Sequence, residues 1–161
     1  MKFITGSNSP EQNSLVGDIR VPGDKSISHR SIMFGSLADG KTEIKGFLEG
    51  EDALATLAAF RAMGVNIEGP ENGHVIVHGV GMNGLKAPKE ALYLGNSGTS
   101  MRLLAGLLAG QNFSVTLTGD SSLSSRPMGR VADPLRLMGA DIETAEQGRP
   151  PITLNGGASL K

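Results

Sequence analysis

The feature that most constrains the fold is an internal repeat with a period of about 75 residues. Residues 61–68 (RAMGVNIE) match residues 136–143 (RLMGADIE), an offset of 75 positions. Two pairs of glycines keep the same offset: Gly73 with Gly148, and Gly81 with Gly156. Similarity at a fixed period indicates one supersecondary unit present twice. The alternative is chance similarity between two helices that each precede strands. Chance accounts less well for the fixed offset of the two glycine pairs.

Hydrophobic patterning predicts a β-α-β-α-β-β order in each unit, and therefore an α/β (α+β) fold. A half-buried strand is expected at residues 18–21, ahead of the Pro22-Gly23 turn. The first unit, residues 22–90, should hold helices at about 26–38 and 51–63 and strands at 42–47, 65–68 and 74–78. The second unit, residues 91–161, should hold helices at 99–109 and 127–138 and strands at 91–94, 114–118, 140–144 and 152–154.

Two features of this pattern leave a question for the structure. Pro134 falls inside the helix expected at 127–138. Either the helix kinks there, or Asp133 caps a shorter helix that begins at Pro134. Arrays of small repeats usually need at least three copies to bury their apolar faces, so two copies are expected to leave such faces uncovered.

Charge and cysteine content exclude several classes of protein. The chain has 15 Lys and Arg against 16 Asp and Glu, a net charge of −1, which gives no general field for nucleic acid or an anionic membrane. The absence of cysteine excludes disulfides and thiolate sites and suits a reducing compartment, with the cytoplasm as the expected location. The N-terminal apolar run is too short for a signal peptide, and no apolar stretch is long enough to span a membrane.

The segment VPGDKSISHRS, residues 21–31, places many hydrogen-bond donors at the start of a predicted helix. Free backbone N–H groups and the helix dipole favour an anion at such a position. Lys25, Ser26 and Arg30 could add charged or hydroxyl donors to the same place. Alternatively, Ser26 or Ser28 caps the helix while the two cations lie in solvent. The local sequence supports both interpretations equally.

Two further segments repeat this arrangement. LGNSGTSMR, residues 94–102, has a glycine-rich turn before a helix, and Gly98 would let a ligand approach the backbone. In SSLSSRPMGR, residues 121–130, Arg126 precedes Pro127 near a third helix start. Each segment alone is more often an ordinary capped turn or a surface arginine. Together, they are explained by one polyanionic ligand in a common cleft.

Other motifs carry little functional information. GVGMNG, residues 79–84, fits a dinucleotide-binding pattern, but Pro88 follows where a helix should begin, so a hairpin exit is expected. No GxxxxGK[ST] phosphate loop is present. His74 and His78 should lie about 13 Å apart on one strand, too far to share a metal ion. His29 could donate to an anion or point to water.

Four motifs in this order resemble the N-terminal part of the 5-enolpyruvylshikimate-3-phosphate synthase family: PGDKSISHR, LEGEDALATL, LGNSGTSMRLLAG and SRPMGR. The resemblance covers about residues 15–157, and the KSxSxR pattern favours this family over the related UDP-N-acetylglucosamine enolpyruvyl transferases. It implies transfer of the enolpyruvyl group of phosphoenolpyruvate to the 5-hydroxyl of shikimate 3-phosphate, with release of phosphate. No metal or organic cofactor is expected.

The resemblance also implies roles for individual residues. Lys25 should contact both substrates, and Lys25 and Arg126 should be the catalytic cations. Ser26 and Arg30 should bind shikimate 3-phosphate, Gly98 and Arg126 phosphoenolpyruvate, and Thr99 the shikimate ligand. In the family, the glycine at Gly98 borders the site of the inhibitor glyphosate, and alanine there accompanies resistance. This chain is therefore expected to be of the sensitive type.

Family members are longer than this chain, with two domains of three units each and the active site between them. Two of six units are then expected here, with the third unit and the second domain absent. Residues 1–21, with a first strand from residue 15, should belong to the partner domain. The fragment alone should be inactive without the missing C-terminal portion. A stand-alone anion-binding domain and the structural half of a split protein are the alternatives.

Overall fold

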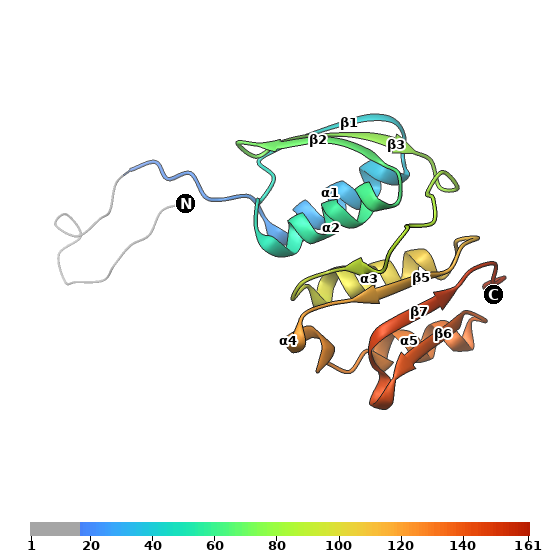
Figure 1. Cartoon of the computed structure of the whole chain (residues 1–161). Coiled ribbons are helices and arrows are strands. Elements are labelled where there is room, and N and C mark those ends of the chain that lie inside the picture. Colours follow the sequence, from blue (N-terminus) through green and yellow to red (C-terminus); the bar gives the residue numbers. More distant parts are fainter. Residues whose placement is uncertain (1–16) are drawn as a thin grey trace, which may run out of the picture.

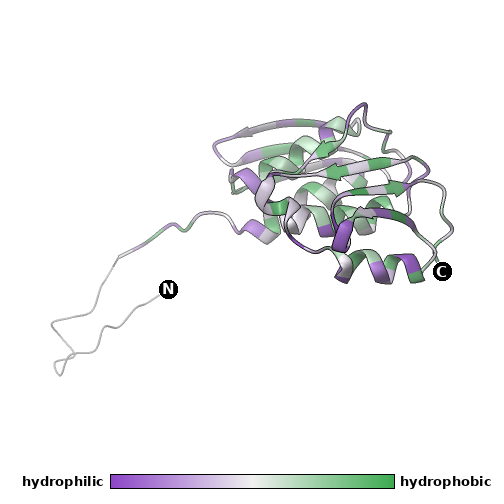
Figure 2. Ribbon diagram, turned by 60° about the horizontal axis from the view of Figure 1, so that its bottom comes forward, coloured by the Kyte–Doolittle hydropathy of each residue, from purple (hydrophilic) through white to green (hydrophobic). Residues whose placement is uncertain are grey.

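The computed structural model describes residues 17–161 and contains two sheets, each covered on one face by two helices (Figure 1). Residues 1–16 lie outside the described part, and with them the prediction about a signal peptide and the start of the strand expected from residue 15. Polar and apolar residues alternate along the strands (Figure 2). One face of each sheet is therefore available to pack on helices.

The first unit consists of two helices over a three-stranded antiparallel sheet. Its elements are α1 (Lys25–Leu37), β1 (Asp39–Lys45), α2 (Glu51–Ala62), β2 (Asn66–Glu71) and β3 (His74–Val80), with strand order β1-β3-β2. Asp24 caps α1, because its side chain accepts a hydrogen bond from the Ile27 N–H at 2.7 Å. On β3, Val75 and Val77 are fully buried, which anchors the sheet to the helices.

The second unit repeats this arrangement with one added parallel strand. Its elements are β4 (Leu92–Tyr93), α3 (Gly98–Leu108), β5 (Val115–Thr118), α4 (Ser121–Ser124), α5 (Gly129–Leu137), β6 (Asp141–Ala145), η1 (Glu146–Gly148) and β7 (Arg149–Asn155). The strand order is β4-β5-β7-β6, and β4 runs parallel to β5. The two units meet where α2 packs against α3 and β4.

The repeat predicted from sequence is confirmed in backbone detail. Both ends of β3 and β7 differ by 75 positions, as do the last residues of α2 and α5. Asn72 and Gln147, also 75 positions apart, both have positive φ, at 52° and 60°, and each precedes a glycine with positive φ. The last glycine pair departs from the offset, because Gly81 corresponds in conformation to Gly157 (φ 74° and 84°).

The repeated arginines perform the same task in both units. Arg61, at the end of α2, donates to the carbonyls of Ile67 and Gly69 in β2. Arg136, at the end of α5, donates through Nε to the carbonyl of Ile142 in β6 at 3.0 Å. Each guanidinium therefore ties the end of a helix to the strand that follows it, which explains why arginine recurs at this position.

Two predicted elements differ from the structure near the first unit. The strand expected at residues 18–21 is not formed, and Ile19 and Val21 are 66% and 70% exposed. A strand needs a neighbour for its backbone hydrogen bonds, and no strand pairs with this segment in the described part of the chain. The strand predicted at 42–47 begins earlier, because Asp39 and Gly40 already belong to β1 and pair with Val80 and Gly79.

The helix predicted at 127–138 forms as α5, and α4 is a separate short helix ahead of it that the sequence did not predict. The second helix begins at Gly129 and continues through Pro134 to Leu137, so the alternative of a shorter helix capped by Asp133 is wrong. Asp133 instead pairs with Arg136 across one turn, at 2.8 Å. Arg136 therefore contacts both Asp133, one turn earlier on the helix, and the carbonyl of Ile142 in β6.

A buried polar cluster joins α1, α2 and α3. It consists of His29, Thr56, Ser97 and Ser100, all fully buried, and we call it the polar junction. Thr56 Oγ1 lies 2.8 Å from His29 Nδ1 and 2.7 Å from Ser100 Oγ. Ser100 Oγ lies in turn 2.6 Å from Ser97 Oγ. The two units are therefore connected by directional hydrogen bonds as well as by apolar packing.

His29 follows neither of its predicted alternatives. It is fully buried, so it reaches neither water nor an exposed anion, and its Nε2 has no hydrogen-bond partner in the described part of the chain. Burial is the main cause that lowers the pKa of His29 below 6.5. Lys25 and Arg30 lower the pKa further, while Asp52 opposes them. The neutral imidazole is the form that the fold accommodates.

Removal of either repeated arginine should loosen its helix end. We expect Arg61→Ala and Arg136→Ala each to lower the free energy of unfolding by about 1 kcal/mol, because each loses hydrogen bonds to backbone carbonyls. Urea unfolding of the two variants beside the wild-type chain measures this. A wild-type free energy in either variant would show that the arginine does not support the unit.

The stability of the chain should fall as pH drops below 6.5. The unfolded chain then takes a proton on His29 that the folded chain, with its lowered pKa, resists. The fold also lowers the pKa of three carboxyls, Glu43, Glu68 and Asp120. Their protonation reduces stability only at lower pH, below about their ordinary pKa values of 4.5 and 3.8. Urea unfolding between pH 5 and 8 should show a flatter slope for His29→Asn than for the control His74→Asn. Equal slopes would contradict the assignment.

Candidate functional site

The first donor segment, residues 24–30, is held at the start of α1 by its turn and its cap. Gly23 approaches the backbone so closely that an added Cβ would lie 1.9 Å from the Gly46 carbonyl oxygen. Lys25 is the first residue of α1, and its Nζ forms an ion pair with Asp52 in the first turn of α2. Its side chain is 53% exposed, so the ammonium group remains accessible. We call residues 24–30 the lysine segment.

The other predicted donors of the lysine segment are exposed. Arg30 donates through Nη1 to the carbonyl of Ser26 at 3.1 Å, which keeps the guanidinium near the helix start. The alternative that a serine caps the helix is wrong, because Asp24 is the cap and Ser28 is bonded to the Asp24 carbonyl at 2.8 Å. The side chains of Ser26 and Arg30 therefore stay available to a ligand.

The second donor segment, residues 96–102, surrounds Gly98 at the start of α3, and we call it the glycine segment. Ser97 caps the helix by accepting from the Ser100 N–H at 3.2 Å. Gly98 is buried beneath two guanidinium groups. A Cβ at this position would lie 2.9 Å from Arg102 Nη1 and 3.3 Å from Arg126 Nη1. Thr99, beside it, is half-buried. Glycine thus keeps the space beneath these cations open.

Arg126 is fixed by a short chain of polar contacts. Its guanidinium donates to Asn96 Oδ1, to the Asn96 carbonyl at 3.4 Å and to Ser122 Oγ at 3.2 Å. Asn96 also donates to Asp120 at 2.9 Å, and Asp120 caps α4 by accepting from the Leu123 N–H at 2.7 Å. Hydrogen bonds from Leu123 and Asn96 lower the pKa of Asp120. The charged form of the Asp120 carboxylate is therefore favoured, and it supports Arg126 through Asn96.

The structure brings some of the predicted residues into direct contact and links the others indirectly. Gly98 and Arg126 lie against each other. The lysine segment reaches the glycine segment through Asp52 and the polar junction. The helices α1, α2 and α4 also begin on the same side of the molecule (Figure 1). A hollow of about 230 Å³ is lined by Lys25, Leu48 and residues 50–53, and its lining includes neither Gly98 nor Arg126.

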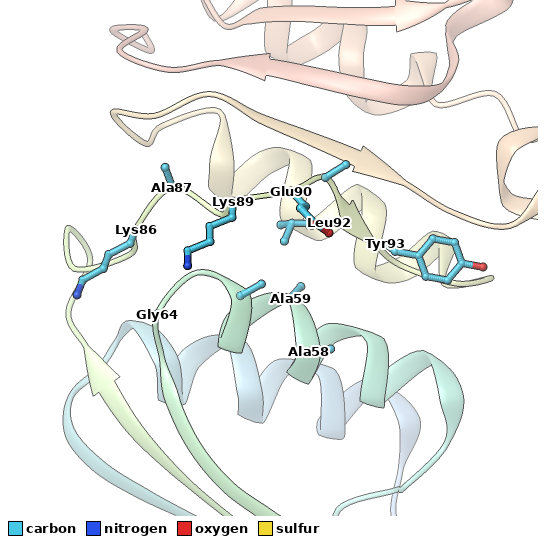
Figure 3. Close-up of a pocket in the computed structure, with 11 residues that line it drawn as sticks. Ala58, Ala59, Gly64, Lys86, Ala87, Lys89, Glu90, Leu92 and Tyr93 are labelled. Atoms are coloured by element: carbon cyan, nitrogen blue, oxygen red, sulfur yellow. The ribbon is translucent and has the colours of Figure 1, made fainter.

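The larger hollow found in the structure is not the donor site. It is a groove of about 690 Å³ that runs between α2 and the connection to β4, and Figure 3 shows the alanines of α2 and Tyr93 along it. Lys89 extends toward the groove. Small apolar side chains dominate this surface, and none of the predicted binding residues lines it. Groove size therefore does not identify the functional site in this chain.

Several residues of the site were not predicted. Arg102 covers Gly98, and its alignment with Arg30 in the repeat was the available signal. Asp52, Asn96 and Asp120 hold the predicted cations. Asp52 and Asn96 lie within quoted motifs, but their pairing with these cations was not predicted because the partners are distant in sequence. Among residues 17–161, no three His, Asp or Glu side chains are grouped to hold a metal ion. No helix of this part is long and apolar enough to cross a membrane.

Comparison with known proteins gives consistent matches. The family model for EPSP synthase (3-phosphoshikimate 1-carboxyvinyltransferase) matches residues 10–161. A 3-phosphoshikimate 1-carboxyvinyltransferase of Methylococcus capsulatus is 68% identical over 147 residues, which are 91% of this chain and 34% of the relative. One from Nitrosococcus oceani is 67% identical over the same number of residues, covering 91% of this chain and 33% of that relative.

The solved structures agree with these relatives. The EPSP synthase of Acinetobacter baumannii matches with a TM-score of 0.88 and 67% identity, over 90% of this chain and 33% of that chain. This chain thus spans about a third of the length of the relatives it matches. The fold is that of the enolpyruvyl transferases, as the four sequence motifs predicted. The chain belongs to the EPSP synthase family.

Proposed function

We propose that the chain is the N-terminal part of an enzyme that transfers the enolpyruvyl group of phosphoenolpyruvate to the 5-hydroxyl of shikimate 3-phosphate, releasing phosphate. The observation that carries this proposal is the contact between Gly98, Arg126 and Arg102, linked through Asp52 and the polar junction to Lys25. Both substrates are anions, and the donors gather at helix starts, where anions are favoured. The chain holds no cysteine, and the cytoplasm remains the expected location.

We assign to the residues the roles that the family resemblance implies, and their charges and positions are compatible with those roles. Arg126 and the Gly98 backbone bind phosphoenolpyruvate, Ser26 and Arg30 bind shikimate 3-phosphate, and Lys25 contacts both substrates. Thr99 faces the shikimate ligand. Because Lys25 pairs with Asp52 in the free chain, the substrates share or replace this carboxylate as the partner of the ammonium group.

The contribution of these residues to catalysis is electrostatic. Protonation of the methylene carbon of phosphoenolpyruvate makes its neighbouring carbon electrophilic, and the shikimate hydroxyl adds to that carbon. The tetrahedral intermediate then expels phosphate. Lys25 and Arg126 stabilise negative charge on the phosphate and carboxylate groups through this sequence, at positions held before the substrates arrive. The groups that move protons belong to the remainder of the enzyme.

The missing length matters for activity. We propose that a third unit and a second domain complete the site, and that residues 18–21 join a sheet of that domain. The exposure of Ile19 and Val21 supports this, because both side chains could be buried by a partner strand. The chain alone should therefore have negligible turnover. A stand-alone anion-binding domain would bind shikimate 3-phosphate alone, whereas a structural half would bind only in the complex.

The isolated chain should bind shikimate 3-phosphate weakly. Titration followed by NMR is expected to give saturable amide shifts at Lys25, Ser26 and Arg30, and addition of phosphoenolpyruvate should extend them to Gly98 and Arg126. Phosphate release should stay at background. Silence from a folded sample would contradict a preformed half-site and leave the chain as a structural half. Turnover by the chain alone would contradict the need for the missing part.

The substitution Gly98→Ala should weaken the phosphoenolpyruvate subsite without unfolding the chain. The added Cβ displaces the flexible ends of Arg102 and Arg126, so we expect roughly tenfold weaker binding of phosphoenolpyruvate and of glyphosate. Affinity for shikimate 3-phosphate should change less than twofold. The control Gly106→Ala places a Cβ in open space on the same helix and should leave both affinities unchanged. Equal affinities in Gly98→Ala and wild type would remove Gly98 from the subsite.

A further inference from the structure

The polar junction is unusual for a packing contact between two units. Four fully buried polar side chains meet where apolar residues would pack at lower cost in desolvation. Each makes a hydrogen bond to another member, and Thr56 contacts members on both sides, His29 on α1 and Ser100 on α3. Directional bonds of this kind fix the rotation and the relative height of helices, which apolar contacts leave adjustable.

The members of the polar junction also lie directly beside the proposed binding residues. In the lysine segment, His29 immediately precedes Arg30 and follows Lys25 by one helical turn. In the glycine segment, Ser97 and Ser100 stand on either side of Gly98 and Thr99. The junction therefore acts on the same backbone segments that carry the proposed binding residues.

We propose that His29 and Thr56 are positioning residues, which hold the lysine segment and the glycine segment in one geometry so that both sides of the anion site act together. This inference rests on the proposed function for its ligand. Neither side chain touches the substrates, since both are fully buried. They act through the backbone of α1 and α3. Only Nδ1 of His29 bonds within the junction, since its Nε2 has no partner among residues 17–161.

Charged groups around His29 agree with this role. Lys25 and Arg30 belong to its own helix, and Asp52 faces it from α2, while the α3 members Ser97 and Ser100 are uncharged. Burial and the two cations favour the neutral imidazole, which can keep its bond to the Thr56 hydroxyl. The junction can therefore persist next to two cations whose task is to bind an anion.

The test replaces Thr56 in the full 161-residue chain. Thr56→Val keeps the shape of the side chain and removes the hydroxyl, whereas Thr56→Ser keeps the hydroxyl. Thr116→Val is the matched control, because it removes a hydroxyl bonded to Thr153 at 3.1 Å in the second sheet. The dissociation constant for shikimate 3-phosphate and the melting temperature are measured for each chain.

We expect Thr56→Val to bind shikimate 3-phosphate about tenfold more weakly than wild type. Thr56→Ser and Thr116→Val should stay within twofold, even where their melting temperatures fall as far as that of Thr56→Val. Should Thr56→Val fail to fold, Ser100→Ala removes the next hydroxyl along and should weaken binding by a smaller factor in the same direction. Wild-type affinity in a folded Thr56→Val or Ser100→Ala overturns the proposal.

A second measurement separates this proposal from the proposed function. Ser100→Ala should shift the amides of Lys25 and Ser26 in the wild-type background, and these shifts should vanish when Thr56→Val is already present. The amide-shift measurement needs no ligand. It therefore tests the positioning role even if the wild-type chain fails to bind shikimate 3-phosphate. Identical shifts in both backgrounds overturn the role of Thr56, whereas absent binding with intact coupling overturns only ligand binding by the isolated chain.

Discussion

The contact on which the rest of the molecule depends is the one between Thr56 and its two neighbours, His29 and Ser100. It lies where the first turns of α1 and α3 meet α2, and it is the point at which two copies of one unit become a single body. Around it, the largest buried side chains of both units form one apolar cluster, Phe60 and Ile32 from the first and Met101 and Leu104 from the second. A buried hydrogen-bonded group is costly to leave without a partner, so these contacts restrict the units to one arrangement.

That arrangement has an electrostatic consequence. Helix starts carry partial positive charge, and the junction holds two of them beside a third, that of α2. Lys25 and Arg126 add full charges, and each is backed by a carboxylate, Asp52 directly and Asp120 through Asn96. The net charge of the chain is only −1, so the positive character is local and arises from placement. An anion that bridges the helix starts gains from all of these charges at once.

Much of the fold was predictable because the sequence repeats one supersecondary unit. The repeat located the ends of α2 and α5, the hairpins after them and the matching arginines, and the family motifs located Gly98 beside Arg126. Elements that depend on a distant partner were not predictable. Residues 18–21 have the alternation of a strand but pair with no strand in the described part of the chain, and the short helix α4 begins at the cap that Asp120 provides. His29 looked like a surface donor because no local pattern reveals that Thr56, 27 positions away, will cover it.

The surfaces of this chain differ in how completely their apolar side chains are covered. At the polar junction, the side-chain polar atoms other than His29 Nε2 are hydrogen-bonded, and the surrounding helices α1, α2 and α3 contribute buried apolar side chains. Elsewhere, Phe34 on α1 and Leu137 on α5 are 69% and 91% exposed, and the alanines of α2 line an open groove. Large apolar side chains left in water on several helices favour association with a further surface. The relatives are about three times as long as this chain, so the further chain in such proteins is what we propose covers these faces.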